Sequence, residues 1–170
     1  MLIIPAASAL PKTYETVVKA VSAHGYSIEA LHIPSVGLET GDGAREGEPP
    51  TMYDDAKFIA ARVAGLADAG NDVLLITHSY GGVPATEVVR GLSKAERGKH
   101  GKEGGIVGLA YMTSLVPEVG MPALTTSPAP LMVVGVSCSL RYTDVDMNKI
   151  RQANGRHRMT AGSTTRTSHS

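Results

Sequence analysis

The sequence predicts an α/β fold, in which a mostly parallel β-sheet carries helices on both faces. Three observations lead to this prediction. Short apolar runs alternate along the chain with stretches of helical periodicity. Residues 72–77 form an almost uniformly apolar run, which is typical of a parallel strand buried on both faces. The 170 residues, 42% hydrophobic and 19% charged, suffice for one globular domain with a core.

The beginning of the chain predicts a strand, a helix and a second strand. Residues 2–5 form a short apolar run. From Thr13 the apolar residues recur at helical spacing until Gly25, where a helix is expected to stop. Residues 26–34 predict the second strand, closed by Pro34. The apolar stripe of the helix consists of Tyr14, Val17, Val18 and Val21.

A loop and a longer helix follow. Residues 35–50 hold four Gly and two Pro without an apolar period, so they predict a loop. Thr51 is a predicted N-cap because Asp54 stands three residues later, as in a capping box. We assign Asp54 and Asp55 to the positive end of the helix dipole rather than to a metal site. The helix ends at Gly70, and its stripe comprises Met52, Ala56, Ile59, Ala60, Val63, Leu66 and Ala67.

The rest of the pattern continues the alternation. The strand at 72–77 is followed by a helix that tolerates Pro84 in its first turn and is marked by Val83, Ala85, Val88, Val89 and Leu92. Residues 91–105 are polar and predict an irregular excursion. Residues 106–117 predict a further buried strand, and residues 131–136 one more.

Composition excludes several classes of partner. Sixteen basic residues balance sixteen acidic ones, so no net field would recruit nucleic acid or an anionic membrane. The apolar start lacks a basic leader and no apolar run reaches transmembrane length, so we expect a soluble, cytoplasmic protein. Cys138 is the only cysteine, which excludes an internal disulfide and a thiolate zinc cluster. Dinucleotide and phosphate-loop patterns are absent, and we predict no cofactor and no metal.

Ser79 follows a predicted buried strand and precedes Gly81 and Gly82. At such a strand-to-helix turn a serine hydroxyl stands at the carboxyl end of the sheet, where ligands of α/β proteins bind. The glycines allow strand and helix to approach closely, and the following helix points backbone N–H groups at the same place. Ser79 is therefore a candidate nucleophile. The alternative is that Ser79 only caps the helix.

The surrounding motifs resemble a known family. The stretch THSYGG matches the nucleophile-elbow pattern G-x-S-x-G, with Thr77 in place of the first Gly. The stretches LHIPSVG, PPTMYDDA and GGIVGLAYMTSLVPEVG flank it in this order. Over about residues 2–120 the chain resembles the α/β-hydrolase superfamily, in particular small esterase-like AB hydrolase-1 proteins. The resemblance implies the α/β-hydrolase fold, with Ser79 as the nucleophile.

The resemblance also implies an oxyanion hole made of backbone N–H groups. The stretch PAASA stands where the family has Pro-Gly-Ala-Trp-His, which makes Ala7 the first donor and Tyr80 the second. His78 is expected to form a wall of the pocket rather than to act as the base. Ala6 replaces the family's glycine and Ser8 its large aromatic residue, so we expect an altered oxyanion hole.

A catalytic triad needs an acid and a histidine after the serine. If residues 131–136 replaced the family's later strand, Asp144 or Asp146 could supply the acid, and His157 or His169 the base. A solvated side chain is the alternative for His157, which lies between Arg156 and Arg158, and His169 lies in the predicted tail. After Pro117 only 53 residues remain, and their sequence does not resemble the family, so the triad stays open.

The part after Pro117 does not continue the resemblance. We predict a shortened family member, with residues 1–136 as a partial α/β-hydrolase core. Residues 137–170 hold six basic residues against two acidic ones and end in a Ser/Thr-rich stretch, so we predict a disordered tail.

Two functions remain open at this point. The first is a serine hydrolase that acts on carboxylic esters or related small acyl compounds through Ser79. The second is a non-catalytic remnant of the hydrolase fold that binds an apolar ligand or a protein partner. The sequence leaves the natural substrate and the oligomeric state undetermined.

Overall fold

The computed structural model describes residues 1–37 and 47–116. Its sheet contains four parallel strands in the order β2-β1-β3-β4. The strands are β1 (Leu2–Ile4), β2 (Glu29–Ala30), β3 (Asp72–His78) and β4 (Gly105–Met112). The predicted parallel α/β architecture is therefore confirmed.

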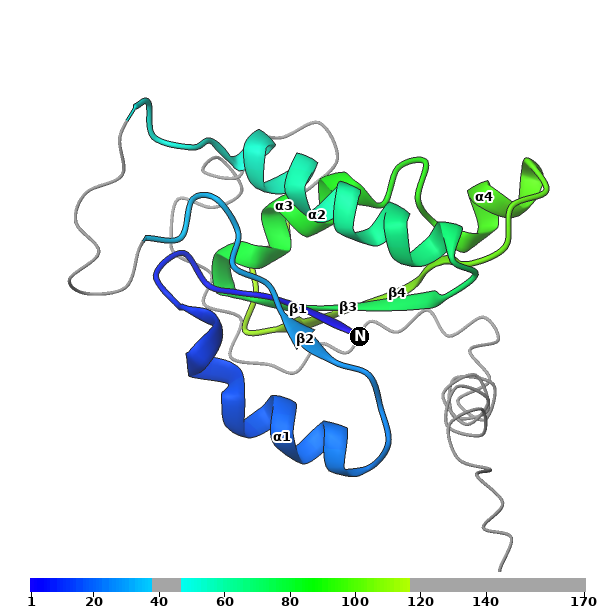
Figure 1. Ribbon diagram of the computed structural model, residues 1–170. Helices are drawn as coiled ribbons and strands as arrows, with labels where there is room; N and C mark the ends of the chain where they lie inside the picture. Colours follow the sequence, from blue (N-terminus) through cyan, green and yellow to red (C-terminus); the bar gives the residue numbers. More distant parts are fainter. Residues whose placement is uncertain (38–46, 117–170) are drawn as a thin grey trace, which may run out of the picture.

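Helices cover both faces of this sheet (Figure 1). The 3-10 turn η1 (Pro11–Tyr14) and helix α1 (Glu15–Ala23) lie on one face. Helices α2 (Met52–Asp68), α3 (Gly82–Val88) and α4 (Lys94–Lys99) lie on the other, and the 3-10 turn η2 (Ser79–Gly81) joins β3 to α3. Among the described residues, none of the helices has the length and apolarity that a bilayer crossing requires.

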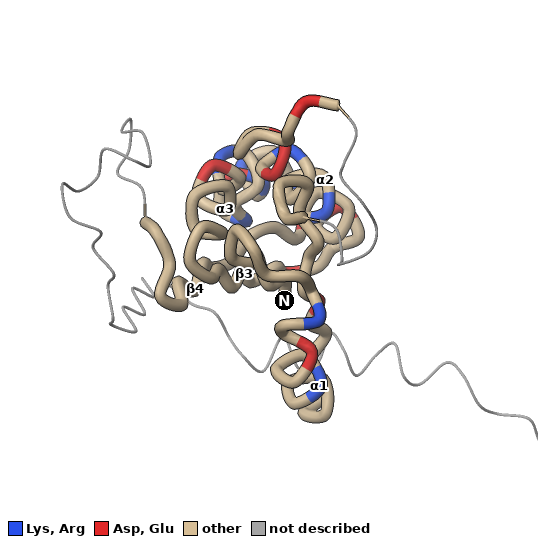
Figure 2. Tube along the Cα trace, turned by 90° about the vertical axis from the view of Figure 1, so that its left-hand side faces the viewer, with Lys and Arg blue, Asp and Glu red and all other residues tan. Residues whose placement is uncertain are grey.

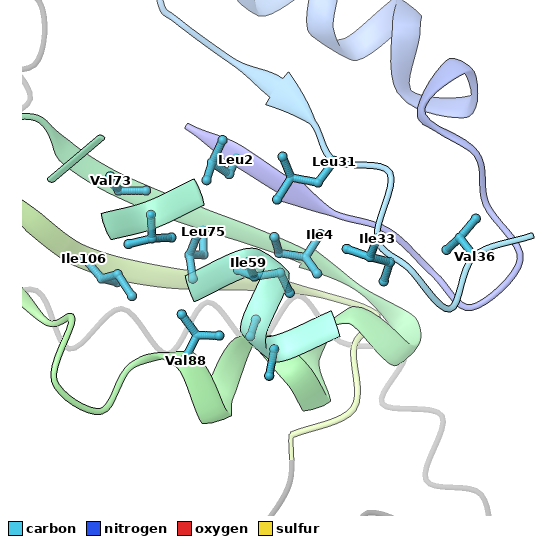
Figure 3. Packing of buried hydrophobic residues seen from close by; sticks show 13 residues of the cluster. Leu2, Ile4, Leu31, Ile33, Val36, Ile59, Val73, Leu75, Val88 and Ile106 are labelled. Carbon is cyan, nitrogen blue, oxygen red and sulfur yellow. The ribbon is translucent and has the colours of Figure 1, made fainter. Parts of the chain in front are cut away.

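The core lies between the sheet and the helices α2 and α3 (Figure 3). Val73, Leu75 and Thr77 of β3 point to this side and are fully buried, while the intervening residues are half-buried. Ile59 and Val88 approach the strand residues from the two helices. Burial of one such aliphatic side chain contributes about 1.5–3 kcal/mol. Strand β3 was expected to be buried on both faces. It is fully buried on the face toward α2 and α3 and half-buried on the other face.

Helix α2 begins as its sequence predicts. The Thr51 hydroxyl accepts a hydrogen bond from the Asp54 N–H, and the Asp54 carboxylate accepts from the Thr51 N–H at 2.7 Å. This reciprocal capping box satisfies two backbone donors that the helix leaves unpaired. The predicted apolar stripe faces the sheet, with Ile59, Val63 and Ala67 fully buried.

Three elements differ from the expectation. Strand β2 is only Glu29–Ala30, which pair with Leu2 and Ile3 of β1. Helix α1 buries none of its side chains fully, and Val17 of the predicted stripe is 48% exposed. Helix α3 ends at Val88, short of the predicted Leu92.

The predicted irregular stretch at 91–105 contains helix α4. Ser93 caps it by accepting from the Glu96 N–H, and the Arg97 guanidinium is buried. Arg97 donates to the carbonyls of Glu103 and Gly104 and pairs with an Asp68 carboxylate at 2.8 Å. The helix forms because these contacts, rather than an apolar stripe, hold it against α2 and the loop before β4.

Charged side chains lie mainly on the helices and connecting loops, and β4 contains none (Figure 2). The expected strand at 131–136 and the boundary between core and tail at residue 136 lie outside the described residues. Strand β4 corresponds to the predicted strand at 106–117 but ends at Met112, followed by a turn in which Thr113 has a φ of 43°.

Candidate active site

The carboxyl ends of β1 and β3 form the candidate active site (Figure 1). Ile4, the last residue of β1, pairs with Thr77 in β3. The turn that contains Ala7 and the turn that contains Ser79 therefore leave adjacent strands at the same edge of the sheet. The three residues predicted for the nucleophile and the oxyanion hole, Ala7, Ser79 and Tyr80, are brought to this edge.

Ser79 has a left-handed backbone, with a φ of 51°. A side-chain-bearing residue in this region stores about 1–3 kcal/mol of strain, which the surrounding structure must sustain. The capping alternative receives no support, because Gly81 occupies the N-cap of α3 and the Ser79 side chain makes no capping bond there. Ser79 instead stands at the sharp turn between β3 and η2, and it is half-buried.

The two glycines after the elbow each face a different neighbour. A Cβ on Gly81 would collide with the Ile4 carbonyl and lie 2.7 Å from the Pro5 carbonyl oxygen. A Cβ on Gly82 would collide with the Leu115 carbonyl and the Ser114 hydroxyl. Gly81 therefore lets the elbow approach the end of β1, and Gly82 lets the segment after β4 approach α3. The predicted close approach to a strand is confirmed at Gly81, whereas Gly82 meets the segment after β4.

The Ser79 carbonyl is held by the segment after β4. It accepts hydrogen bonds from the Ser114 hydroxyl at 2.8 Å and from the Leu115 N–H at 2.9 Å. Thr77, which stands where the family pattern has glycine, is fully buried and donates to the Ser114 oxygen at 2.9 Å. Sequence reasoning missed Ser114, because nothing in the linear pattern indicates a contact across 37 residues.

Tyr14 links the loop after β1 to the end of β3. Its hydroxyl accepts from the Ala6 N–H at 3.1 Å and lies 2.9 Å from His78 Nδ1. The two rings meet edge to face, with centroids 6.0 Å apart. The Ala6 N–H is thus occupied, whereas the Ala7 N–H makes no hydrogen bond to any described residue. His78 packs against Tyr14 next to the site, and its role as a wall of the pocket stays a prediction.

Tyr80 is anchored by a buried carboxylate. Its hydroxyl donates to Asp55 at 2.7 Å, and the same carboxylate accepts from the Ser35 N–H at 2.8 Å and the Ser35 hydroxyl at 2.5 Å. Desolvation and the hydrogen bond to Asp55 raise the pKa of the Tyr80 phenol to about 12. Asp54 serves the helix start as predicted, but Asp55 joins α2 to the loop after β2 and to the elbow.

The other predicted site residues lie outside the described part of the chain, namely Asp144, Asp146, His157 and His169. Within residues 1–37 and 47–116, no group of three His, Cys, Asp or Glu side chains could hold a metal ion. A hollow of about 500 Å³ lies at the other end of the strands, where they begin. Its lining includes Glu29, Arg62, Asp72 and Lys94. The positive φ and the hydrogen bonds at the elbow, not this hollow, identify the candidate site.

Comparisons with known proteins agree with this geometry. The model of the alpha/beta hydrolase family matches residues 2–159, which is further than the expected resemblance over 2–120. Alpha/beta hydrolase nvfD of Aspergillus novofumigatus (strain IBT 16806) is 30% identical over 120 residues, covering 71% of this chain and 44% of that protein. "Probable hydrolase R7" of Phoma sp. (strain ATCC 20986 / MF5453) is 26% identical over 120 residues, with the same coverage of 71% and 44%.

A solved structure shares the fold. A histidine-to-alanine mutant of polyneuridine aldehyde esterase superposes with a TM-score of 0.54 at 14% identity, covering 71% of this chain and 42% of that one. The chain spans less than half the length of the curated relatives it matches. The family match covers most of the chain, and the fold and the elbow agree with it. The chain belongs to the alpha/beta hydrolase family.

Proposed function

We propose that the protein is a serine hydrolase that cleaves carboxylic esters or related small acyl compounds, with Ser79 as the nucleophile. The Ser79 oxygen attacks the acyl carbonyl carbon and forms a tetrahedral intermediate. Its proton passes through a base to the leaving alcohol, and water then releases the acid and restores the serine. The family resemblance implies a histidine base, for which the candidates lie beyond the described residues.

The strained backbone of Ser79 carries the proposal. A φ of 51° is uncommon at a residue other than glycine, and residues strained in this way cluster at active sites. Ser79 is held in this conformation by strand β3 before it, by the tightly packed Gly81 and Gly82 after it, and by the hydrogen bonds to its carbonyl. This conformation is the one that the sharp strand-to-helix turn of a nucleophile elbow requires.

The neighbouring amides support the same reaction. The carbonyl oxygen gains negative charge as the serine attacks, and preorganised N–H donors stabilise it. The Ala7 N–H makes no hydrogen bond to a described residue and lies in the turn after the adjacent strand β1. The Tyr80 N–H follows the nucleophile directly. We assign these two amides to the oxyanion hole.

A fluorophosphonate probe tests the proposal, because the activated serine oxygen displaces fluoride from phosphorus and stays labelled. We expect the full chain to be labelled and the Ser79→Ala variant not to be. Ser22→Ala is the matched control, since Ser22 is exposed on α1 and remote from the elbow. A chain that is folded by circular dichroism but unlabelled would refute the proposal and favour a non-catalytic binding protein.

A further inference from the structure

The Ser79 carbonyl and the Tyr80 N–H belong to the same peptide group. A trans peptide is planar, so its C=O and N–H point in opposite directions. Whatever fixes the direction of the Ser79 carbonyl therefore also fixes the direction of the Tyr80 N–H. No peptide bond among the described residues is cis.

Three donors reach that carbonyl: the Gly82 N–H lies within the elbow itself, and the other two come from the segment after β4. The Ser114 hydroxyl donates at 2.8 Å and the Leu115 N–H at 2.9 Å. Both bonds have the short lengths of well-formed hydrogen bonds. They tie the carbonyl to strand β4, whereas the bond from Gly82 is local to the turn.

The direction of the next bond follows from proton counting. A carbonyl can only accept, so the single proton of Ser114 is committed to Ser79. Thr77 must then donate its own proton to the Ser114 oxygen, 2.9 Å away. Its hydroxyl lies 3.4 Å from the Ala110 carbonyl, which is the weaker contact. The chain of donation runs from Thr77 to Ser114 to Ser79.

The elbow needs this support because its own residues are permissive. Gly81 and Gly82 follow Tyr80 and restrict the backbone little. Gly82 also provides the space that the Ser114 hydroxyl occupies, since a Cβ there would collide with it. Gly82 thus makes the turn more flexible and also leaves room for the Ser114 hydroxyl, which holds the Ser79 carbonyl.

We propose that Ser114 and Thr77 are positioning residues for the oxyanion hole: Ser114 holds the Ser79–Tyr80 peptide so that the Tyr80 N–H faces the reacting carbonyl, and Thr77 orients Ser114. This inference rests on the proposed function of Ser79 and Tyr80. Neither side chain has to touch the substrate. Their effect should appear in the reaction step and not in the binding of the probe.

The test compares fluorophosphonate labelling of the full-length wild type with Ser114→Ala, Thr77→Val and Thr77→Ser. Losing an oxyanion donor outright costs about 10²–10³-fold, so a loosened but retained donor should slow the labelling step on the order of tenfold in Ser114→Ala. The probe concentration for half-maximal rate should stay unchanged. Thr77→Val should show a smaller loss, and Thr77→Ser, which keeps the donor, should recover the wild-type rate.

Val63→Ala is the control for a general loss of stability, because Val63 is fully buried on α2 and away from the elbow. Its labelling rate should match that of the wild type at temperatures where it is folded. Wild-type rates in folded Ser114→Ala and in Thr77→Val would overturn the inference while leaving the proposed function intact. If Ser114→Ala fails to fold, the comparison of Thr77→Val with Thr77→Ser decides, and equal labelling rates in these two variants would overturn the inference. An unlabelled wild type would instead refute the proposed function, and the positioning role with it.

Discussion

Replacing Ser79 by glycine should make the protein more stable than replacing it by alanine. Alanine keeps the Cβ that makes a φ of 51° unfavourable, whereas glycine adopts this conformation freely. The left-handed region costs a Cβ-bearing residue about 1–2 kcal/mol. The greater freedom of glycine in the unfolded chain returns about 0.5–1 kcal/mol of this gain. Taken at the middle of both ranges, the remainder favours Ser79→Gly over Ser79→Ala by about 0.75 kcal/mol.

Urea unfolding of the two variants measures this difference as a shift in midpoint at constant slope. Ala61→Gly is the matched control, because Ala61 is exposed within α2, where the backbone is right-handed. The same exchange of alanine for glycine should there destabilise the protein by about 1 kcal/mol. A Ser79→Gly variant that is no more stable than Ser79→Ala would show that the elbow stores no strain, and the main support for a functional Ser79 would be lost.

Three further outcomes are expected. Gly81→Ala should lower the free energy of unfolding by about 3 kcal/mol or more in urea titrations, because the new Cβ meets backbone carbonyls that cannot rotate away. Hydrogen bonds from Thr51 lower the pKa of Asp54. The ionised carboxylate therefore stabilises the fold above the ordinary carboxyl pKa, and this stabilisation is lost as pH falls through the lowered pKa. The difference in unfolding free energy between wild type and Asp54→Asn should accordingly become smaller in acid. Burial and Asp55 raise the pKa of Tyr80 from 10.0 to about 12, so this residue stabilises the fold fully below pH 10 and loses the effect as pH rises through about 12. Tyr80→Phe should lack that alkaline loss in unfolding titrations, and its tyrosinate absorbance titration should lack the transition near pH 12.

Local signals in the sequence predicted much of the fold. The capping pair of Thr51 and Asp54, followed by an apolar stripe and Gly70, defined α2 because a helix start, face and end are each encoded within a few residues. Helix α4 was missed although Ser93 and Glu96 have capping spacing, since the segment is polar and lacks an apolar stripe. It is held by the buried Arg97, which pairs with Asp68 of α2 and donates to the carbonyls of Glu103 and Gly104.

The candidate site, like the fold, has residues that the sequence predicted and contacts that it did not. Ser79 and the glycines were predictable, because a strand-to-helix turn is a local feature with its own residue preferences. The contacts of Asp55 with Tyr80 and of Thr77 with Ser114 were not, because they depend on how helix α2 and strand β4 lie against β3. The neighbouring Asp54 and Asp55 also have different roles, because Asp54 caps helix α2 whereas Asp55 binds Tyr80. Only the folded helix shows that the two side chains point in different directions.

A bulge in β4 explains how the segment after this strand meets the elbow. Val73 pairs with Ile106, but Leu74 pairs with Gly108, so β4 contains one extra residue at this point. Residues three apart normally face opposite sides of a strand, yet Ile106 and Leu109 both pack on the core beneath α2 and α3. From there Tyr111 shares a face with Thr77, its partner in the register, and its hydroxyl lies 2.9 Å from the Thr86 hydroxyl in α3. The bulge thus sets the register that brings the end of β4 over Thr77 and the Ser79 carbonyl, because a shift of one residue would turn every following side chain to the other face.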